Sequence, residues 1–310
     1  RVPQDETTPF SFGLANPTCR DETKIKTTKP SLIMKIDSHH HFWKYDPQTY
    51  SWMNHKMDIL KDDYQPSDLR SEISAVGIDG VVSVQADQSL RETDDLLDHA
   101  KANDFILGVV GWLPLTDANV GDLMDKYSDN NLLKGIRHVV QDEPVDDFIL
   151  GEHFNRGVSL IKEHDWVYDI LIYERQLGPS IEFVDRHPNQ VFVLDHIAKP
   201  RIGDSLIEPW KSQMYELAKR ENVSCKLSGI ATEADWGSWK KDDLFPYMEI
   251  ALDAFGPQRM MFGSDWPVAR LAIEYGPWVE ICREFISKLS ENEQSLIEGE
   301  VAIQVYGLKE

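Results

Sequence analysis

Eight short apolar runs alternate with amphipathic stretches along most of this 310-residue chain, and no other feature constrains the fold as strongly. The runs that we expect to be strands are Lys35–His41, Gly80–Ala86, Ile106–Pro114, Gly135–Val140, Val167–Ile172, Val191–His196, Ser224–Gly229 and Met260–Asp265. Their near-continuous hydrophobicity is typical of parallel strands buried on both faces. Eight such strands, each followed by a helix, predict an α/β fold of the (β/α)8 barrel type, with a doubly wound open sheet as the alternative.

The stretches between these runs carry helical periodicity. Leu69, Ile73 and Val76 repeat at i, i+4 and i+7 behind Ser67, which is the expected N-cap, and later stretches repeat in the same way. No glycine-rich phosphate-binding motif follows an expected strand, which disfavours the nucleotide-binding version of the open sheet.

Residues 1–33 differ in composition from the rest of the chain. They are rich in Thr, Pro, Lys and Asp and hold no sustained hydrophobic period, so we expect a flexible extension or a cloning-derived tail, with Met34 as the natural start. Residues 34–310 are then expected to form one barrel domain.

The formal net charge is −21, from 53 acidic and 32 basic residues, which disfavours nucleic acid or an anionic membrane as a partner. No apolar run reaches the roughly 18 residues of a membrane span, and no signal-peptide core is present in the given chain. We therefore expect a cytoplasmic protein that acts on a neutral small molecule, as a monomer or a homo-oligomer.

Two histidines near the start are placed for metal binding. In the segment IDSHHHFW, His39 and His41 are one residue apart on an expected strand, so both side chains project to the same side while His40 faces elsewhere. Imidazole suits Zn²⁺ and similar ions, and the pair would form half of a metal site.

Polar residues follow other strands at the end where a barrel gathers its catalytic groups. These residues are Arg137 and His138, Asp195, His196 and Lys199, Lys226 and Ser228, and Asp265. Asp265 precedes Trp-Pro, where a strand must stop. Consecutive strand residues face opposite ways, so only one of Arg137 and His138 should enter the barrel mouth, and the sequence leaves open which one.

The motifs IDSHHHFW, GIRH, LDHIAKP, CKLSG and FGSDWP, in this order, resemble the amidohydrolase superfamily, in the amidohydrolase-2 branch that includes sugar lactonases. The resemblance spans Met34 to about Leu308. It implies a distorted TIM barrel with a metal-assisted hydrolytic centre. His39 and His41 match the metal-binding pair of the superfamily, His196 its strand-6 histidine and Asp265 its strand-8 aspartate.

The chain departs from the dinuclear members of the superfamily. Those members carry a carboxylated Lys after strand 4 and a His on strand 5, whereas this chain has Arg137 and His138 at the first place and no histidine in Val167–Ile172. The resemblance therefore implies one divalent metal, with Zn²⁺ as the first candidate, on His39, His41 and Asp265. It also extends to relatives that hold the metal weakly or work without one.

The resulting hypothesis is hydrolysis of a sugar-acid lactone, of the L-fuconolactone or L-rhamnonolactone type, to the aldonate. Asp265 would take the proton of the attacking water, and His196 or Arg137 would donate to the carbonyl oxygen as negative charge develops. Aromatic and polar residues near strand ends are expected to bind the ring: Trp43, Trp112, His138, Tyr173, Lys199, Trp236 and Trp266.

Three other interpretations stay open at this stage. A related hydrolase or decarboxylase would act on a carboxylated cyclic substrate and would need several basic residues in the mouth. A protein with a degenerate site would bind metal or sugar without turnover. An open-sheet enzyme would belong to another class altogether.

Overall fold

The computed structural model describes residues 34–309, so the expectations for residues 1–33 lie outside the described part. Eight parallel strands pair in the order β1 to β8 in one sheet. Their bounds are β1 Ile36–His40, β2 Gly80–Val84, β3 Ile106–Gly111, β4 Leu133–Val139, β5 Val167–Leu171, β6 Phe192–Leu194, β7 Val223–Leu227 and β8 Met260–Phe262. The prediction of eight parallel strands at these positions is confirmed.

The first and last strands come together just beyond their ends. The backbone N–H of Asp265 donates to the carbonyl of His39 at 2.8 Å, and the N–H of His41 donates to the carbonyl of Trp266 at 2.7 Å. A parallel bridge also joins His40 to Trp266. These bonds nearly close the sheet into the predicted barrel, so the open-sheet alternative is wrong.

All eight strands end earlier than predicted, and the ends of β6 and β8 matter most for the site. β6 stops at Leu194 rather than His196, and β8 stops at Phe262 rather than Asp265. His196 has φ 54° and Asp265 has φ 60°, in the left-handed region that extended backbone does not use. Both residues therefore lie in sharp turns after the strands rather than on them.

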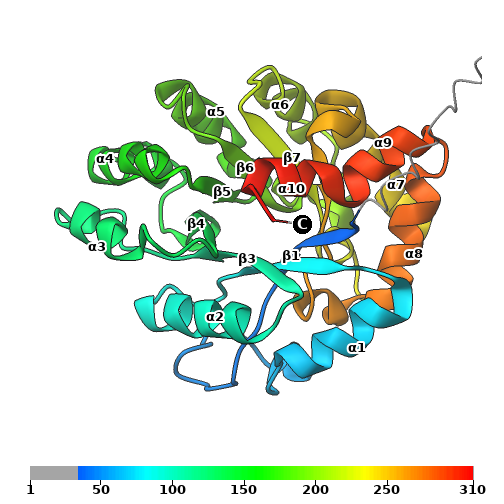
Figure 1. The fold of residues 1–310 in the computed structure, drawn as a ribbon. Coiled ribbons are helices and arrows are strands. Elements are labelled where there is room, and N and C mark those ends of the chain that lie inside the picture. Colours follow the sequence, from blue (N-terminus) through cyan, green and yellow to red (C-terminus); the bar gives the residue numbers. More distant parts are fainter. Residues whose placement is uncertain (1–33, 310) are drawn as a thin grey trace, which may run out of the picture. The chain divides into compact units, whose positions relative to one another are not determined.

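Helices surround the strands as an outer ring (Figure 1). Their bounds are α1 Pro66–Val76, α2 Leu90–Ala102, α3 Val120–Tyr127, α4 Glu152–Ile161, α5 Leu177–Arg186, α6 Trp210–Leu217, α7 Lys241–Phe255, α8 Tyr275–Ile286, α9 Glu291–Ser295 and α10 Val301–Tyr306. The N-cap of α1 is Gln65, not Ser67, because Pro66 occupies the first helical position, where its missing N–H costs nothing. Within 34–309, no helix combines the length and the apolar composition of a membrane span.

Helices α1 to α8 each bury one face against the barrel. On α4, Phe154, Val158 and Ile161 are at most 1% exposed, and they follow the spacing predicted from the sequence. Burying one such side chain contributes about 1.5–3 kcal/mol, so these faces hold the ring of helices on the sheet.

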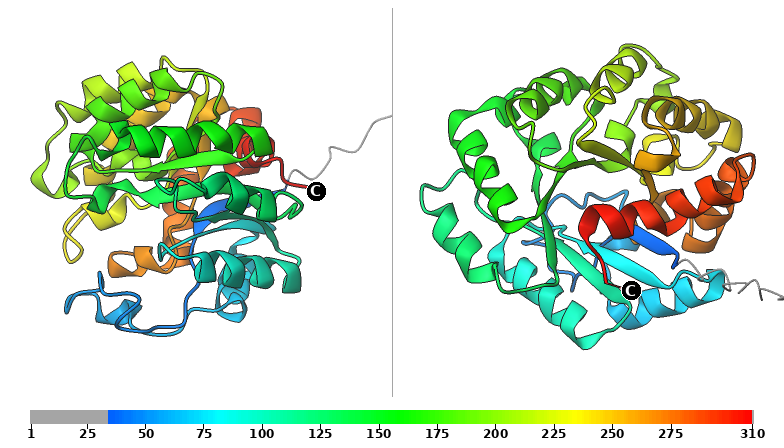
Figure 2. Two further views of the ribbon diagram at one scale, coloured as in Figure 1. Left: turned by 90° about the vertical axis from the view of Figure 1, so that its left-hand side faces the viewer. Right: turned by 45° about the horizontal axis from the view of Figure 1, so that its top comes forward.

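The barrel interior is apolar at the end where the strands begin. Side chains from the strands and from the end of the chain pack there in one cluster: Ile36, Val82, Val84, Val110, Val167, Val193, Met261, Val301, Ala302, Tyr306 and Leu308. Helix α10 lies across this end of the barrel (Figures 1 and 2). The opposite end, where the strands stop, is the one that holds the polar residues.

Candidate active site

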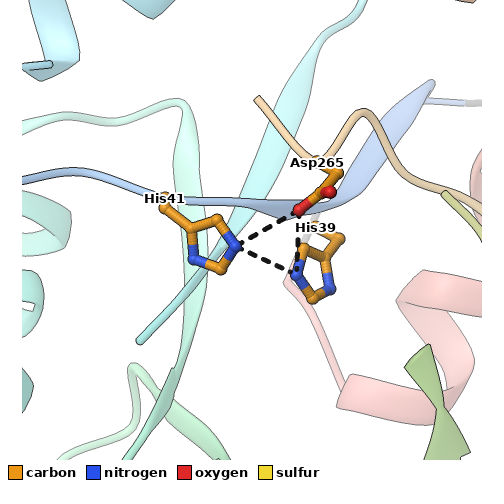
Figure 3. Close-up of side chains that lie close together, drawn as sticks. All are labelled: His39, His41 and Asp265. Carbon is orange, nitrogen blue, oxygen red and sulfur yellow. Dashed lines mark hydrogen bonds and ion pairs between the residues drawn. The ribbon is translucent and has the colours of Figure 1, made fainter. Parts of the chain in front are cut away.

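Three side chains meet at the mouth of the barrel: His39 on β1, His41 just after it, and Asp265 in the turn after β8. The Nε2 atoms of His39 and His41 are 3.3 Å apart, and Oδ1 of Asp265 lies 3.7 Å from the first and 3.4 Å from the second (Figure 3). All three side chains are buried, with exposures of 5% or less. The predicted convergence of His39, His41 and Asp265 is therefore present in the structure.

This triangle has the dimensions of a metal site. Ligands bound at 2.0–2.1 Å in a tetrahedron lie about 3.3 Å apart, close to the three observed separations. His41 donates its Nδ1 proton to the carbonyl of Val84 at 2.7 Å, which leaves the Nε2 lone pair facing Asp265. Nδ1 of His39 lies 3.2 Å from the Lys226 ammonium and 3.3 Å from Oδ1 of Asp195. Two imidazole nitrogens and one carboxylate oxygen are thus able to hold a divalent metal.

His196 joins the triangle through an unusual turn. His196, Ile197, Ala198 and Lys199 all have φ between 47° and 61°, a left-handed run that costs roughly 1–2 kcal/mol for each non-glycine residue. Ile197 and Ala198 are fully buried, and the Trp210 indole N–H donates to the Ile197 carbonyl at 2.8 Å, which holds the turn. The turn places Nε2 of His196 3.8 Å from Oδ1 of Asp265. Strain of this kind persists where packing enforces it, and it concentrates at functional sites.

Two glycines allow this close packing. A Cβ at Gly229, where φ is +60°, would overlap Nδ1 of His196 and would approach Oδ2 of Asp265 to 3.0 Å. A Cβ at Gly263 would lie 2.9 Å from the Cβ of His39. The glycines of the CKLSG and FGSDWP segments are therefore needed for the close approach of the catalytic candidates.

A charged layer lies between the site and the apolar end of the barrel. The Lys226 ammonium contacts Asp169 at 2.5 Å, Asp195 at 3.0 Å and Nδ1 of His39 at 3.2 Å. Arg137 Nη1 lies 2.9 Å from Asp195 and 3.3 Å from Nε2 of His39. Two cations thus face two carboxylates, and the layer is balanced in charge and supports His39 from below.

Comparison with known proteins shows the family of this chain. The family model described as Amidohydrolase matches residues 36–308. The chain belongs to this amidohydrolase family.

Individual relatives of this amidohydrolase cover most of its length. An L-fucono-1,5-lactonase of Burkholderia multivorans is 38% identical over 288 residues, which are 89% of this chain and 97% of that protein. An L-fucono-1,5-lactonase of Burkholderia ambifaria is 34% identical over 259 residues, covering 82% of this chain and 88% of that protein. A crystal structure of a Burkholderia multivorans amidohydrolase with bound Zn has a TM-score of 0.86 at 38% identity and covers 89% of this chain and 100% of that one.

Burial and neighbouring charges set the protonation of the amidohydrolase site. Burial lowers the pKa of His196 to about 4 and holds the pKa of His39 well below its usual value, so both rings are neutral near pH 7. Burial would raise the pKa of Asp265, but His196, His41 and Lys199 outweigh it and lower the pKa below its usual value. Asp265 is therefore ionised at neutral pH, as a base or a metal ligand must be.

A cavity of about 420 Å³ opens above the triangle. It is lined by His41, Trp52, Asn54, Met57, Ala86, Arg137, Val139, Gln141, Asp142, Leu171, Tyr173, His196, Lys199, Thr232, Glu233, Trp236, Asp265, Val268 and Leu271. Of the residues expected to bind the ring, Tyr173, Lys199 and Trp236 lie in this wall. Arg137, rather than His138, is the strand-4 residue that faces the mouth.

The other residues expected to bind the ring lie outside the wall of this cavity. Trp43 is buried and bridges to Tyr64, and Trp266 is buried edge-on against that same tyrosine. His138 stacks on Phe148 and bonds Glu143 at 2.6 Å, and the indole N–H of Trp112 donates to Nδ1 of His138. These side chains point away from the mouth of the barrel. They pack against the loops and the surrounding layer instead.

Sequence reasoning missed Glu233 and Trp52, which line the cavity from loops, and Asp169, which neutralises Lys226. Asp169 carried a detectable signal, since a lone acid inside the apolar run Val167–Leu171 is costly to bury without a partner cation. Glu233 and Trp52 lie in polar loop sequence with no motif, and only the folded chain brings them to the site.

Proposed function

We propose that this amidohydrolase hydrolyses the ester of a sugar-acid lactone, of the L-fuconolactone or L-rhamnonolactone type, to the aldonate. The observation that carries the proposal is the carboxylate of Asp265 beside three imidazoles at the wall of the 420 Å³ cavity. The identity of 34–38% to proteins named L-fucono-1,5-lactonase supports the substrate class.

Asp265 acts as the general base in this proposal. Its Oδ1 is the oxygen nearest to all three imidazoles, so Oδ2 is left to accept the proton of the attacking water. The carboxylic acid so formed returns that proton to the ring oxygen as the ester bond breaks. The low pKa of Asp265 keeps the base ionised through the neutral range.

His196 and Arg137 stabilise the tetrahedral oxyanion. Oγ of Ser228 lies 2.9 Å from Nδ1 of His196, and a hydroxyl that donates there leaves the proton of the neutral ring on Nε2, facing Asp265 and the cavity. That N–H donates to the carbonyl oxygen as charge develops on it. Arg137, fixed by Asp195, adds a positive charge at the same wall of the cavity.

His39, His41 and Asp265 would hold a divalent metal, with Zn²⁺ as the first candidate. When bound, such an ion polarises the lactone carbonyl and lowers the pKa of a coordinated water towards about 7. The chain's own part is to present the Nε2 atoms of His39 and His41 side by side, with His41 fixed by its hydrogen bond to the carbonyl of Val84.

The charges of the cavity favour a neutral substrate over a carboxylated one. Arg137 and Lys226 are both committed to buried aspartates, and Arg270 pairs with Glu274 outside the cavity wall. Lys199 is the remaining cation of the wall among the described residues, and Glu233 lies 4.0 Å from it. A dicarboxylated ring would find no free pair of cations, which argues against the alternative substrate class.

A pH-indicator assay over a panel of aldonolactones tests the proposal. We expect the purified chain to release acid from L-fucono-1,5-lactone or L-rhamnonolactone faster than spontaneous opening. Repeating the assay with a chelator, and then with added Zn²⁺, measures the contribution of the metal. Acid release from none of the lactones by folded protein supplied with Zn²⁺ would overturn the proposal.

A further inference from the structure

Glu233 is a cavity residue that the proposed reaction does not use. It ends the short turn Ala231–Glu233 after β7 and lines the same cavity as His41, His196 and Asp265. Its side chain is only 19% exposed, yet no donor of the described residues lies within hydrogen-bonding distance of its carboxylate. The nearest cation is Lys199, whose Nζ is 4.0 Å from Oε1.

The surroundings of this carboxylate show that it lies near the reacting centre. Burial raises the pKa of Glu233, Lys199 opposes that rise, and the charge of Asp265 adds to it. The charges of Lys199 and of the proposed base Asp265 therefore both act on Glu233. A mostly buried carboxylate on a cavity wall, with lone pairs that no side chain occupies, can accept hydrogen bonds from the hydroxyl groups of a bound ring.

The rest of this wall is suited to a sugar ring. Trp236 is held in place by its indole N–H, which donates to the carbonyl of Thr232 at 2.8 Å. The Lys199 ammonium lies 5.4 Å from the centre of the Tyr173 ring, which keeps the cation at the cavity wall. The wall thus offers a fixed indole, a cation that donates and a carboxylate that accepts.

We propose that Glu233, paired with Lys199, binds two neighbouring hydroxyl groups of the lactone and thereby selects neutral polyhydroxylated rings. The two oxygens of one carboxylate accept from two adjacent hydroxyls, while the ammonium donates to one of the same hydroxyl oxygens. A deoxy ring leaves the acceptor unpaired, and a ring with its own carboxylate is repelled. This inference rests on the proposed lactonase function for the identity of the ring.

Binding of a ring that the enzyme does not hydrolyse tests this inference independently of the proposed catalysis. The probe is L-fucono-1,5-lactam, the ring amide of the lactone, together with its 2-, 3- and 4-deoxy forms, measured by titration calorimetry. For the wild-type chain we expect removal of a hydroxyl at two adjacent positions to weaken binding by about 10- to 100-fold each, the range of a charge-assisted hydrogen bond.

In Glu233→Gln we expect both of these deoxy penalties to shrink to about 3-fold or less, because a neutral amide accepts more weakly. Lys199→Met is expected to shrink the penalty at one of the same positions. Glu174→Gln is the matched control, since it removes a nearby charge outside the cavity wall and should keep the wild-type penalties. Equal penalties in the wild type and in both cavity variants would overturn the inference, even if the lactone is hydrolysed.

Repulsion of a carboxylated ring gives a second readout. D-glucaro-1,4-lactone carries a free carboxylate, and we expect it to bind Glu233→Gln at least about 10-fold more tightly than it binds the wild type or Glu174→Gln. Unchanged affinity in Glu233→Gln would show that this residue does not exclude carboxylates.

Discussion

Gly229 packs directly against the imidazole of His196, so that any Cβ at residue 229 would overlap Nδ1 of that ring. The two residues come from neighbouring turns, one after β7 and one after β6. The position of His196 therefore depends on the missing side chain of Gly229 and on the positive φ of 60° that residue 229 adopts.

Gly229→Ala is expected to reduce kcat for lactone hydrolysis by at least about 10²-fold, because His196 must move from its place beside Asp265. Gly237→Ala in the same loop is the control, since a Cβ there meets no atom within 4 Å. Circular dichroism verifies that both variants are folded. Wild-type activity in Gly229→Ala would contradict the proposed role of His196.

The metal content of variants distinguishes His41, a proposed ligand, from its neighbour His40. His41→Gln is expected to lose most of the metal from a wild-type content of about one ion per chain, because one of three ligands is removed. His40→Gln should keep the metal, since His40 faces away and bonds Ser83 at 2.9 Å. Elemental analysis of dialysed protein measures both. Equal loss in the two variants would contradict the assignment of the ligands.

The charged layer under His39 is expected to be important for stability. Lys226→Met leaves Asp169 and Asp195 buried without their shared cation, which should lower the free energy of unfolding by about 3–5 kcal/mol. Lys219→Met removes a cation from a surface pair with Glu216 and should cost about 1 kcal/mol or less. Urea unfolding measures both values. Similar losses in the two variants would contradict this prediction.

Stability should also depend on the protonation of His196. Its pKa is about 4 when buried in the folded chain, against about 6.5 when unfolded. Between these values the unfolded chain binds more protons, so the free energy of unfolding falls as the pH drops from about 6.5 to 4. This one group accounts for about 3 kcal/mol of that fall.

His196→Gln is expected to reduce this acid-dependent loss. Urea unfolding at several pH values, with a chelator present so that metal binding does not contribute, measures the slope in the variant and in the wild type. Identical slopes would show that His196 is not held neutral by the fold.

Much of the site follows from local sequence rules. His39 and His41 face one way because strand residues alternate, and Asp265 reaches them because strand ends of a barrel meet at one rim. The choice between Arg137 and His138 could not be made, because it depends on which face of β4 turns inward. That orientation is set by packing against distant residues such as Phe148 and Asp195.

Loop residues were the least predictable part. Trp43 and Trp266 follow strands as expected, but both pack against Tyr64 outside the cavity wall, while Trp236 lines the cavity. The left-handed turn that begins at His196 has no sequence signal, since it contains no glycine and is held by burial and by the hydrogen bond from the distant Trp210. Contacts between segments far apart in the chain decided these positions.

The central claim is that Asp265 takes the proton of the water that opens the lactone. The most direct measurement compares acid release from L-fucono-1,5-lactone by the wild type, by Asp265→Asn and by the control Asp235→Asn, whose side chain caps a turn through Ser238. We predict that kcat of Asp265→Asn falls by at least ~10²-fold while the control is unchanged. A kcat for Asp265→Asn within a few-fold of the wild type would contradict the account.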